Sequence, residues 1–496
     1  KAGPYNGLSV YEARKKIVED LKKLGLIVKS EKILHRTPEC WRSKNPIEFI
    51  SMREYYLKQL EVSDDLLQIV DLIKFYPAAS KQLLLNWISS ITTDWPISRR
   101  RYYGTEIPIW YCKKCGKPHL PKTGKYYQPW KEKAPFNRCD CGSNEFLGET
   151  RTFDTWMDSS GSALYIAGYE RDVDLFNKAF PVYLRPQGTD IVRSWLYYSI
   201  LKAYHLTRKP AFREVRISGM GLDEKGEAMH KSKGNVVYPE PLFQKYGADA
   251  FRLWGAMEAK VGSDYRFSEN RVEGASKFIT KLWNIARFVS SFPQPQEDYE
   301  LTSLDKMILA ELNKLVDACR KGYDYTDAFI PSTAMRNFTW SLFADHYVEA
   351  AKSRAYNPNY LFTEKAQHGA WYTLHACLQT LLKLLAPLCP FVSDFIWREL
   401  YGKESIHLES FPEKKAELES ELIKITEKFI EFNTAIWKYK KDSGIALNES
   451  LDLVYAPEEL KPLKIDLEAM HKIRDLNFGV AKAELLRIGK DIYVAK

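Results

Sequence analysis

The chain has 496 residues, more than a single hydrophobic core usually serves, so two to four domains are expected. Its composition, 45% hydrophobic and 28% charged, is typical of a soluble globular protein, and we expect a cytoplasmic protein because we find neither a long apolar run nor a secretory leader. The net charge of +9 is compatible with a polyanionic partner, although lysine-rich solvated surfaces are common.

The first predicted element is a helix over residues 9–24, where apolar residues recur every three or four positions between charged ones and Gly25 follows. A mixed, turn-rich stretch comes next. Residues 64–91 again have a helical pattern, and residues 99–111 are aromatic and extended. The pattern then changes where the cysteines begin.

Four of the eight cysteines are clustered at the spacing of a metal site. A Cys-x-x-Cys pair precedes a lysine-rich loop and a Cys-x-Cys pair, and four such thiolates can hold Zn²⁺ tetrahedrally in a structural role. They are Cys112, Cys115, Cys139 and Cys141. Because the second pair lacks the common two-residue spacing, His119 is an alternative ligand, and four free thiols are the competing interpretation. The clustering also favours a metal site in a reducing compartment over a framework of disulfide bonds.

A β-α-β unit is predicted near the middle of the chain. An apolar run over residues 181–185 leads through residues 188–190 into a helix and out to a second strand over residues 214–218. In a parallel pair joined by a helix, the ligand-binding loops lie at the carboxyl ends of the strands. Residues 188–190 and the loop that begins at Gly219 should therefore face one cleft.

After about Phe267 the sequence has the pattern of long amphipathic helices as far as Tyr401, which predicts a helical bundle. A short mixed segment ends the chain. The expected fold class is therefore α/β plus all-α. It combines the second half of a Rossmann-like nucleotide-binding domain, a zinc-bearing connective insertion and the bundle.

The most specific local pattern is the loop over residues 222–235, which directly follows a predicted parallel strand. Two glycines would let it close over a triphosphate, and two lysines and a serine would supply charges and a donor. These residues are Gly226, Gly234, Lys231, Lys233 and Ser232. A solvated basic hairpin is the competing interpretation of an isolated loop of this kind.

Met229 to Ser232, followed by residues 233–236, resembles the Lys-Met-Ser-Lys-Ser loop of class I aminoacyl-tRNA synthetases. Ala228 replaces the first lysine of that pattern and His230 replaces the first serine. The lysine that the family uses at the phosphates is present as Lys231.

The resemblance extends over nearly the whole chain. Residues 94–99 and 103–110 are similar to the segment that returns the family's chain from its editing domain to the catalytic fold, with Pro96 in place of the usual cysteine. Four further segments are similar to the stem-contact region and the helical anticodon-binding domain. These are residues 246–254, 267–269, 281–284 and 385–391.

Three side chains bear on which amino acid is bound. Ile191 and Trp195 lie four residues apart on one predicted helix, so they would share a face and wall a small pocket. With Trp156 they resemble the valine-binding wall of valyl enzymes, where isosteric threonine would still enter and require editing. Plain core packing is the competing interpretation. An isoleucyl or leucyl relative is the other alternative, and isoleucyl enzymes usually differ at the Ile191 position.

The resemblance also implies roles at the two strand ends. Gly188 would allow close approach of ATP, and Asp190 would accept hydrogen bonds from its ribose hydroxyls. Gly219 and Met220 resemble the adenine-contacting segment. With ATP and Mg²⁺, the family joins its amino acid, here valine, to tRNA(Val) through an aminoacyl-adenylate, with the lysine at the phosphates and the adjacent serine as catalytic residues.

No His-Ile-Gly-His-like sequence occurs, so we expect catalysis to need an N-terminal part that carries this signature. The resemblance implies an editing remnant (1–30), a connective segment with the cysteines (31–150), the second catalytic half (151–272), an anticodon-binding domain (273–420) and a mixed C-terminal segment (421–496). Two functions stay open. The chain is the larger part of a valine-specific ligase, or it is a noncatalytic tRNA-binding module.

Overall fold

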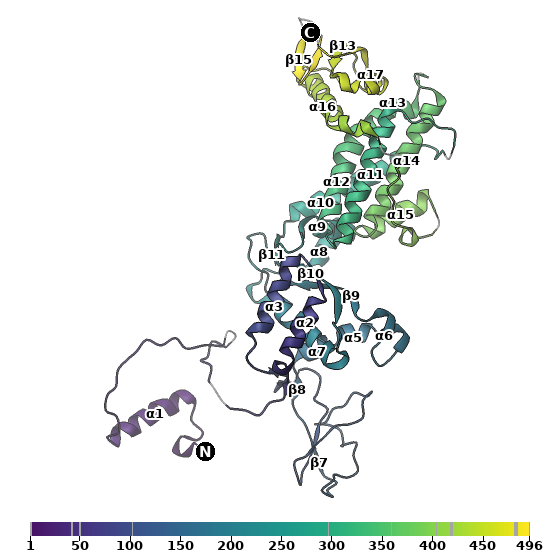
Figure 1. The fold of residues 1–496 in the computed structure, drawn as a ribbon. Helices are drawn as coiled ribbons and strands as arrows, with labels where there is room; N and C mark the ends of the chain where they lie inside the picture. Colours follow the sequence, from purple (N-terminus) through teal and green to yellow (C-terminus); the bar gives the residue numbers. More distant parts are fainter. Residues whose placement is uncertain are drawn as a thin grey trace. The chain divides into compact units, whose positions relative to one another are not determined.

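The computed structural model describes residues 2–40, 43–48, 51–101, 103–295, 297–358, 360–402, 404–416, 420–480 and 485–495. The chain forms two compact units, Lys1–Tyr55 and Tyr56–Lys496 (Figure 1). Within the described ranges, every helix is too short or too polar to cross a bilayer.

The first unit contains the predicted N-terminal helix, α1, Val10–Lys23. Its start is fixed by a capping box, in which the Glu12 amide donates to Ser9 Oγ and the Ser9 amide donates to Glu12 Oε2 at 2.9 Å. Gly25 follows with a φ of +69°, which favours glycine and ends the helix. The helix buries none of its residues, so its apolar stripe stays exposed in this unit.

The centre of the second unit is a three-stranded parallel sheet in the order β2-β10-β9. The strands are β2, Lys74–Tyr76, β9, Val182–Gly188, and β10, Phe212–Ser218. Helix α7, Tyr197–Thr207, connects β9 to β10 and buries Ile200 and Leu201. This confirms the predicted β-α-β unit and places the ends of both strands beside each other.

The expected helical stretch over residues 64–91 is wrong as a continuous element. It divides into α2, Ser63–Asp71, strand β2, and α3, Lys81–Ser90. Phe75 and Tyr76 are buried where β2 pairs with β10. A three-residue strand is too short to alter a helical periodicity, so its pairing partner decides its conformation.

A smaller sheet carries the cysteine segment. It consists of β6, Pro118–His119, β5, Trp110–Cys112, and β7, Phe146–Gly148, with β5 in the centre. At its base, β4, Ser98–Arg99, pairs antiparallel with β8, Thr152–Phe153. The segment is therefore an insertion between two paired strands.

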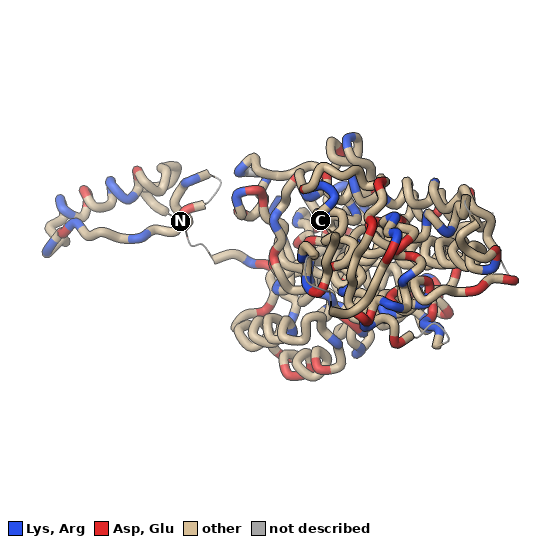
Figure 2. The backbone as a smooth tube through the Cα atoms, turned by 90° about the horizontal axis from the view of Figure 1, so that it is seen from above, with Lys and Arg blue, Asp and Glu red and all other residues tan. Residues whose placement is uncertain are grey.

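The helical part begins after β12, Tyr265–Arg266, which pairs with β11, Gly221–Leu222. It contains α10, Glu269–Val289, α11, Ser303–Asp324, α12, Phe329–Asn337, a π-helix, Phe338–Val348, α13, Glu349–Tyr356, α14, Glu364–Leu385, and α15, Pro390–Leu400. These helices share one hydrophobic core, as predicted. Lysine, arginine and acidic residues are interspersed along the backbone (Figure 2).

The C-terminal segment is a small α/β structure. Helix α16, Thr426–Asp442, precedes β13, Leu451–Ala456, α17, Lys464–His471, β14, Ile473–Phe478, β15, Leu486–Gly489, and β16, Ile492–Val494. The sheet order is β14-β13-β16-β15, with β13 and β14 parallel.

A buried ion cluster joins this C-terminal segment to the bundle. Arg354 on α13 donates through Nη1 and Nη2 to the two carboxylate oxygens of Asp305 at 2.5 and 2.7 Å, and through Nε to Asp466 on α17 at 3.1 Å. The Tyr347 hydroxyl donates to the same Asp305 at 2.6 Å. All four side chains are almost completely buried, so each charge depends on the others for compensation.

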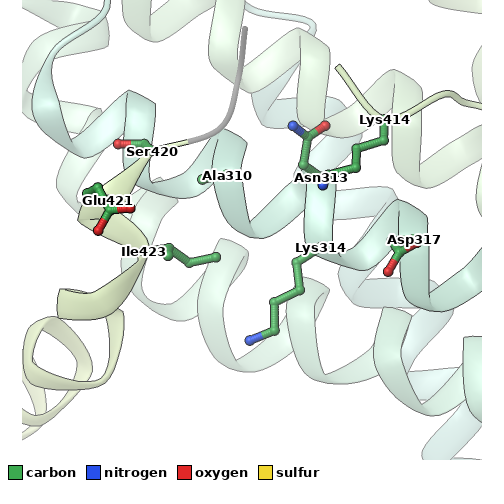
Figure 3. A pocket seen from close by; sticks show the side chains of 8 residues that line it. All are labelled: Ala310, Asn313, Lys314, Asp317, Lys414, Ser420, Glu421 and Ile423. Carbon is green, nitrogen blue, oxygen red and sulfur yellow. The ribbon is translucent and has the colours of Figure 1, made fainter. Parts of the chain in front are cut away.

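A cavity of about 400 Å³ lies beside α11 (Figure 3). It is lined by Ala310, Asn313, Lys314, Asp317, Lys414, Ser420, Glu421 and Ile423. Asn313 holds the adjoining segment, because its Nδ2 donates to the Lys415 carbonyl at 2.6 Å and its Oδ1 accepts from the Lys415 amide at 3.1 Å. None of the predicted site residues lines this cavity, which belongs to the bundle.

Candidate functional site

The site is built at the carboxyl ends of β9 and β10, where Gly188 lies opposite Ser218 in the parallel register. The Thr189 hydroxyl donates to the Ser218 carbonyl at 2.9 Å, and the Ser218 hydroxyl donates to the Gln187 carbonyl at 3.3 Å. These bonds tie the two loops together. The structure thus brings the predicted residues Gly188, Asp190, Gly219 and Met220 to one edge of the sheet.

Asp190 lies directly over the backbone of Gly188. A Cβ at position 188 would come within 2.8 Å of Asp190 Oδ1, so a larger residue there would displace the carboxylate. The Asp190 side chain is exposed and can therefore receive hydroxyl donors from a ligand.

Gly219 is enclosed by backbone atoms of the segment before β12. A Cβ at this position would lie 2.1 Å from the Ser263 carbonyl oxygen, a distance that no side-chain movement relieves. The next residue, Met220, donates through its amide to Asp264 Oδ1 at 2.7 Å and accepts from the Tyr265 amide at 3.0 Å. The strand end is consequently fixed in position by close backbone packing.

Replacing Gly219 with alanine should destabilise this strand end and weaken ATP binding by at least about tenfold, because the chain must move to admit the methyl group. Gly255→Ala is the matched control, since nothing lies within 4 Å of its added Cβ in helix α9, Ala248–Glu258. Equilibrium binding of ATP checks the difference. Equal affinity in the two variants would contradict the role given to Gly219.

The loop at residues 222–235 is held by hydrogen bonds around Asp223 and Asn235. Asn235 Nδ2 donates to Asp223 Oδ2 at 2.8 Å, and the amides of Lys225 and Glu227 donate to Asp223 Oδ1. The Asn235 bond is the largest cause that holds the pKa of the Asp223 carboxyl below its usual value. Asn235 Oδ1 also accepts from the amide of His230 at 2.9 Å.

The two lysines of the loop differ in their surroundings. Lys233 forms an ion pair with Glu227 at 3.3 Å, whereas Lys231 is exposed and has no ion-pair partner in the described part of the chain. Of these two ammonium groups, only that of Lys231 is without a carboxylate partner in the described part of the chain, and the pair that Lys233 forms is itself exposed to solvent. The side chain of Ser232 lies outside what the structure describes. His230 takes part through its backbone, which explains how the loop keeps its shape without serine at that position.

The proposed amino-acid wall comes from two segments. Trp156 lies on α4, Thr155–Ser159, which begins where the Asp154 carboxylate accepts from the Trp156 amide at 3.0 Å. The indole Nε1 of Trp195 donates to the Ser159 carbonyl at 3.1 Å, and this bond joins Trp195 to the end of that helix. The two tryptophans are thus carried by directly connected elements.

The prediction of one regular helix for Ile191 and Trp195 is wrong. The chain forms a 3-10 turn, Thr189–Ile191, then a π-helix, Val192–Leu196, and only then α7. A π-helix adds a residue to the turn, which is a common adjustment at functional sites. Ile191 still borders the site, because its Cγ1 lies 3.7 Å from the position of a Cβ at residue 188.

Sequence reasoning missed Arg185, which packs against the ring of Trp195. Its guanidinium lies 3.4 Å from the ring centroid of Trp195 and 5.0 Å from that of Phe212. Burial lowers the pKa of Arg185 to about 10, and its Nη2 has no hydrogen-bond partner in the described part of the chain. The position two residues before the buried Gln187, on the same face of β9, is the signal that could have indicated it.

Asp154 was also missed, and it joins the cysteine insertion to the site. Its carboxylate accepts from Trp95 Nε1 at 3.3 Å and forms an ion pair with Arg99 of β4, in addition to capping α4. Its own amide donates to the Ile97 carbonyl at 2.7 Å. These contacts connect the base of the insertion directly to the helix with Trp156.

The four clustered cysteines meet as predicted. Their sulfur atoms lie within 4.8 Å of one another, with Cys112 to Cys141 at 3.5 Å and Cys115 to Cys139 at 3.6 Å. Four sulfurs placed tetrahedrally at a Zn–S distance of about 2.3 Å would be about 3.8 Å apart, so the cluster fits this ion. Hydrogen bonding, chiefly by the Cys115 amide, lowers the pKa of Cys112 to about 6. His119 Nε2 is 3.3 Å from the Cys139 sulfur, as a neighbour of the four thiols.

Comparison with known proteins agrees with this geometry. Residues 7–268 match the family model described as tRNA synthetases class I (I, L, M and V), and residues 305–455 match the anticodon-binding domain of tRNA ligase. The chain therefore belongs to the class I aminoacyl-tRNA synthetases.

The curated relatives are more specific. The chain is 47% identical to a valine–tRNA ligase of Pyrobaculum aerophilum, over 97% of this chain and 61% of that protein. It is also 47% identical to that of Aeropyrum pernix, over 95% of this chain and 58% of that one, and 40% identical to that of Nanoarchaeum equitans, over 95% and 61%. The chain thus spans about three fifths of the length of these relatives.

Solved structures share the fold. Methionyl-tRNA synthetase of Mycobacterium tuberculosis in complex with methionyl-adenylate aligns with a TM-score of 0.56 and 18% identity, over 74% of this chain and 66% of that one. The LeuRS–tRNA–LeuAMS complex of Agrobacterium radiobacter aligns with a TM-score of 0.51 and 22% identity, over 66% and 44%. At these identities the likeness concerns the fold alone.

Proposed function

We propose that this chain is the larger part of a valine–tRNA ligase, which attaches valine to tRNA(Val) through valyl-adenylate. The observation that carries the proposal is the convergence at the ends of β9 and β10. There an exposed Asp190, the enclosed Gly219 and the tryptophan wall lie in a chain that is 47% identical to valine–tRNA ligases. The free Lys231 is on the loop that follows.

The chemistry needs charge stabilisation more than proton transfer. The valine carboxylate is already ionised at neutral pH, so one of its oxygens attacks the α-phosphorus of ATP while the bond to the pyrophosphate oxygen breaks. Lys231 would hold the departing phosphates, Ser232 is proposed beside it, and Asp190 would hold the ribose. Mg²⁺ would neutralise phosphate charge when bound. The valyl group then passes to a terminal ribose hydroxyl of the tRNA, and AMP leaves.

The wall would select valine by size. Ile191, Trp156 and Trp195 are proposed to wall a pocket for a small branched side chain, and an added methylene costs about 1–3 kcal/mol in such a pocket. Threonine has nearly the same shape, so the complete enzyme would need its editing domain. We further propose the five segments with the boundaries given above, and an N-terminal part that supplies the remainder of the active site.

The cysteine cluster is proposed to hold one structural Zn²⁺. We expect one zinc per chain by metal analysis and its loss in Cys139→Ser, because three thiolates bind far more weakly than four. Cys319→Ser is the control, since that thiol is buried in α11 away from the cluster. Full zinc content in Cys139→Ser would contradict the assignment of that ligand.

A direct test is charging of tRNA(Val) by this chain together with the N-terminal part. Valine should be attached far faster than isoleucine or leucine. Preferred charging with either of those would instead identify an isoleucyl or leucyl relative. Tight tRNA binding without charging would favour the noncatalytic module, an alternative supported by the anticodon-binding match at residues 305–455.

A further inference from the structure

Arg185 on β9 is a buried cation with little compensation. Its side chain is 8% exposed, and it forms no ion pair in the described part of the chain. Within the same described residues, Nε donates to Gln187 Oε1 at 3.4 Å and Nη2 has no hydrogen-bond partner. An apolar side chain at this position would avoid the cost of burying a charge. What Arg185 contributes therefore lies in the contacts of its guanidinium.

The closest of these contacts is with the indole of Trp195. The guanidinium carbon, Cζ, lies 3.4 Å from the centroid of that ring and 5.0 Å from the ring centroid of Phe212 on β10. A planar cation over the face of a ring is attracted electrostatically, and the attraction is stronger where water is excluded. Arg185 and Gln187 share the buried face of β9. The strand therefore holds the cation against one face of the indole.

The indole of Trp195 is held at a second point, along its edge. Its Nε1 donates to the Ser159 carbonyl at 3.1 Å, at the end of the helix that carries Trp156. A single hydrogen bond at the edge of a ring leaves the ring free to tilt about that bond, whereas a stacked plane prevents the tilt. The hydrogen bond and Arg185 together set both the position and the plane of the indole.

The local backbone does not fix the indole by itself. Trp195 lies in the π-helix Val192–Leu196, and Ile191 ends the 3-10 turn before it. The two residues therefore do not follow each other along one face of a regular helix, where side chains four positions apart support one another. Trp195 is half-buried, so part of its ring is open. The orientation of the ring consequently depends on Arg185 and Ser159, which belong to other elements.

We propose that Arg185 is a positioning residue for amino-acid selection: its guanidinium holds the plane of Trp195, and Trp195 in turn forms one wall of the valine pocket. The inference rests on the proposed function, because it takes Trp195 as part of that pocket. Arg185 acts through the indole and not on the substrate. An indole that can tilt admits a longer side chain, so loss of the stack lowers discrimination without abolishing the reaction.

The test replaces Arg185 with methionine, which keeps an unbranched apolar stem and removes the planar cation. ATP–pyrophosphate exchange in the complete enzyme is measured with valine and with isoleucine. The ratio of kcat/KM for valine to that for isoleucine should fall by at least about fivefold, since a pocket that excludes one methylene discriminates by about 10- to 200-fold. KM for valine should rise. KM for ATP should stay unchanged, because other contacts hold the nucleotide side of the site at Asp190 and Gly219.

Arg216→Met is the matched control on the neighbouring strand, β10. Arg216 donates to the carbonyls of Thr326 at 2.7 Å and Ala259 at 3.2 Å, so its loss should lower the unfolding midpoint and leave the valine-to-isoleucine ratio unchanged. Arg185→Met should show the reverse pattern, a lower ratio without a lower midpoint. Arg185→Lys keeps the charge but loses the planar stack, so it should not restore the ratio. A wild-type ratio in Arg185→Met, or an equal change in Arg216→Met, would overturn the proposal.

A fluorine spectrum of the chain itself reports on the indole without any reaction. In protein labelled with 5-fluorotryptophan, Trp195→Phe identifies the Trp195 resonance among those of the 13 tryptophans. This resonance should shift and broaden in Arg185→Met and stay in place in Arg216→Met, because only the first variant removes the cation from the ring. An unchanged Trp195 resonance in Arg185→Met would contradict the positioning role. Absence of valine-dependent exchange in the wild type would contradict the proposed function, and the fluorine spectrum would still decide whether Arg185 holds Trp195.

Discussion

Replacing Lys231 with alanine in the complete enzyme should lower kcat for valine activation by about 100- to 1000-fold, the usual cost of removing one group that stabilises charge in the transition state. Lys231 is exposed, lies on the loop that follows the nucleotide site and has no ion-pair partner in the described ranges. KM for ATP should change much less than kcat, because the interaction strengthens as the phosphates separate.

Lys233→Ala is the matched control, two residues away on the same loop. Its ammonium is already paired with Glu227, so its loss should change kcat by less than about threefold. Steady-state pyrophosphate exchange measures both variants. If Lys233→Ala were the more damaging change, the assignment of the phosphate-binding lysine would be wrong.

Replacing Arg354 with methionine should lower the free energy of unfolding by about 3–5 kcal/mol, because it leaves the carboxylates of Asp305 and Asp466 buried without their counter-charge. The bidentate bond to Asp305 and the bond to Asp466 both disappear. The C-terminal segment should then separate from the bundle at lower denaturant concentration. Urea unfolding measures the change.

An exposed pair provides the comparison for Arg354. Arg474 and Asp452 form an ion pair at 2.8 Å on neighbouring strands, and both side chains are open to solvent. Arg474→Met should therefore leave the unfolding midpoint essentially unchanged. An unchanged midpoint in Arg354→Met would show that the buried cluster does not hold the two parts together.

Elements with long, regular patterns could be predicted from the sequence, and short ones could not. The helix at residues 9–24, the β-α-β unit and the bundle after Phe267 all follow from periodicity. Strand β2 contributes three residues, and only its pairing with β10 distinguishes it from the helices on either side. The π-helix before α7 was missed for a similar reason, because one extra residue in a turn changes the spacing too little.

In the candidate site too, some residues could be predicted from the sequence and others could not. Glycines and lysines in a loop after a parallel strand are visible in the sequence, and the four cysteines have a recognisable spacing. Arg185 and Asp154 act through contacts with Trp195, Trp95 and Arg99, which are distant in sequence or on another element. Such contacts exist only once the chain is folded, so the sequence can at most place Arg185 on one face of β9 and does not identify its partners.

Valine-dependent ATP–pyrophosphate exchange, with and without the proposed N-terminal part that carries a His-Ile-Gly-His-like signature, tests the central claim most directly. Isoleucine and threonine serve as comparison substrates. Exchange that appears only on complementation and is fastest with valine is the predicted result. Exchange in neither condition, while tRNA is still bound, would contradict the account and make the chain a binding module whose loop, altered at Ala228 and His230, no longer supports catalysis.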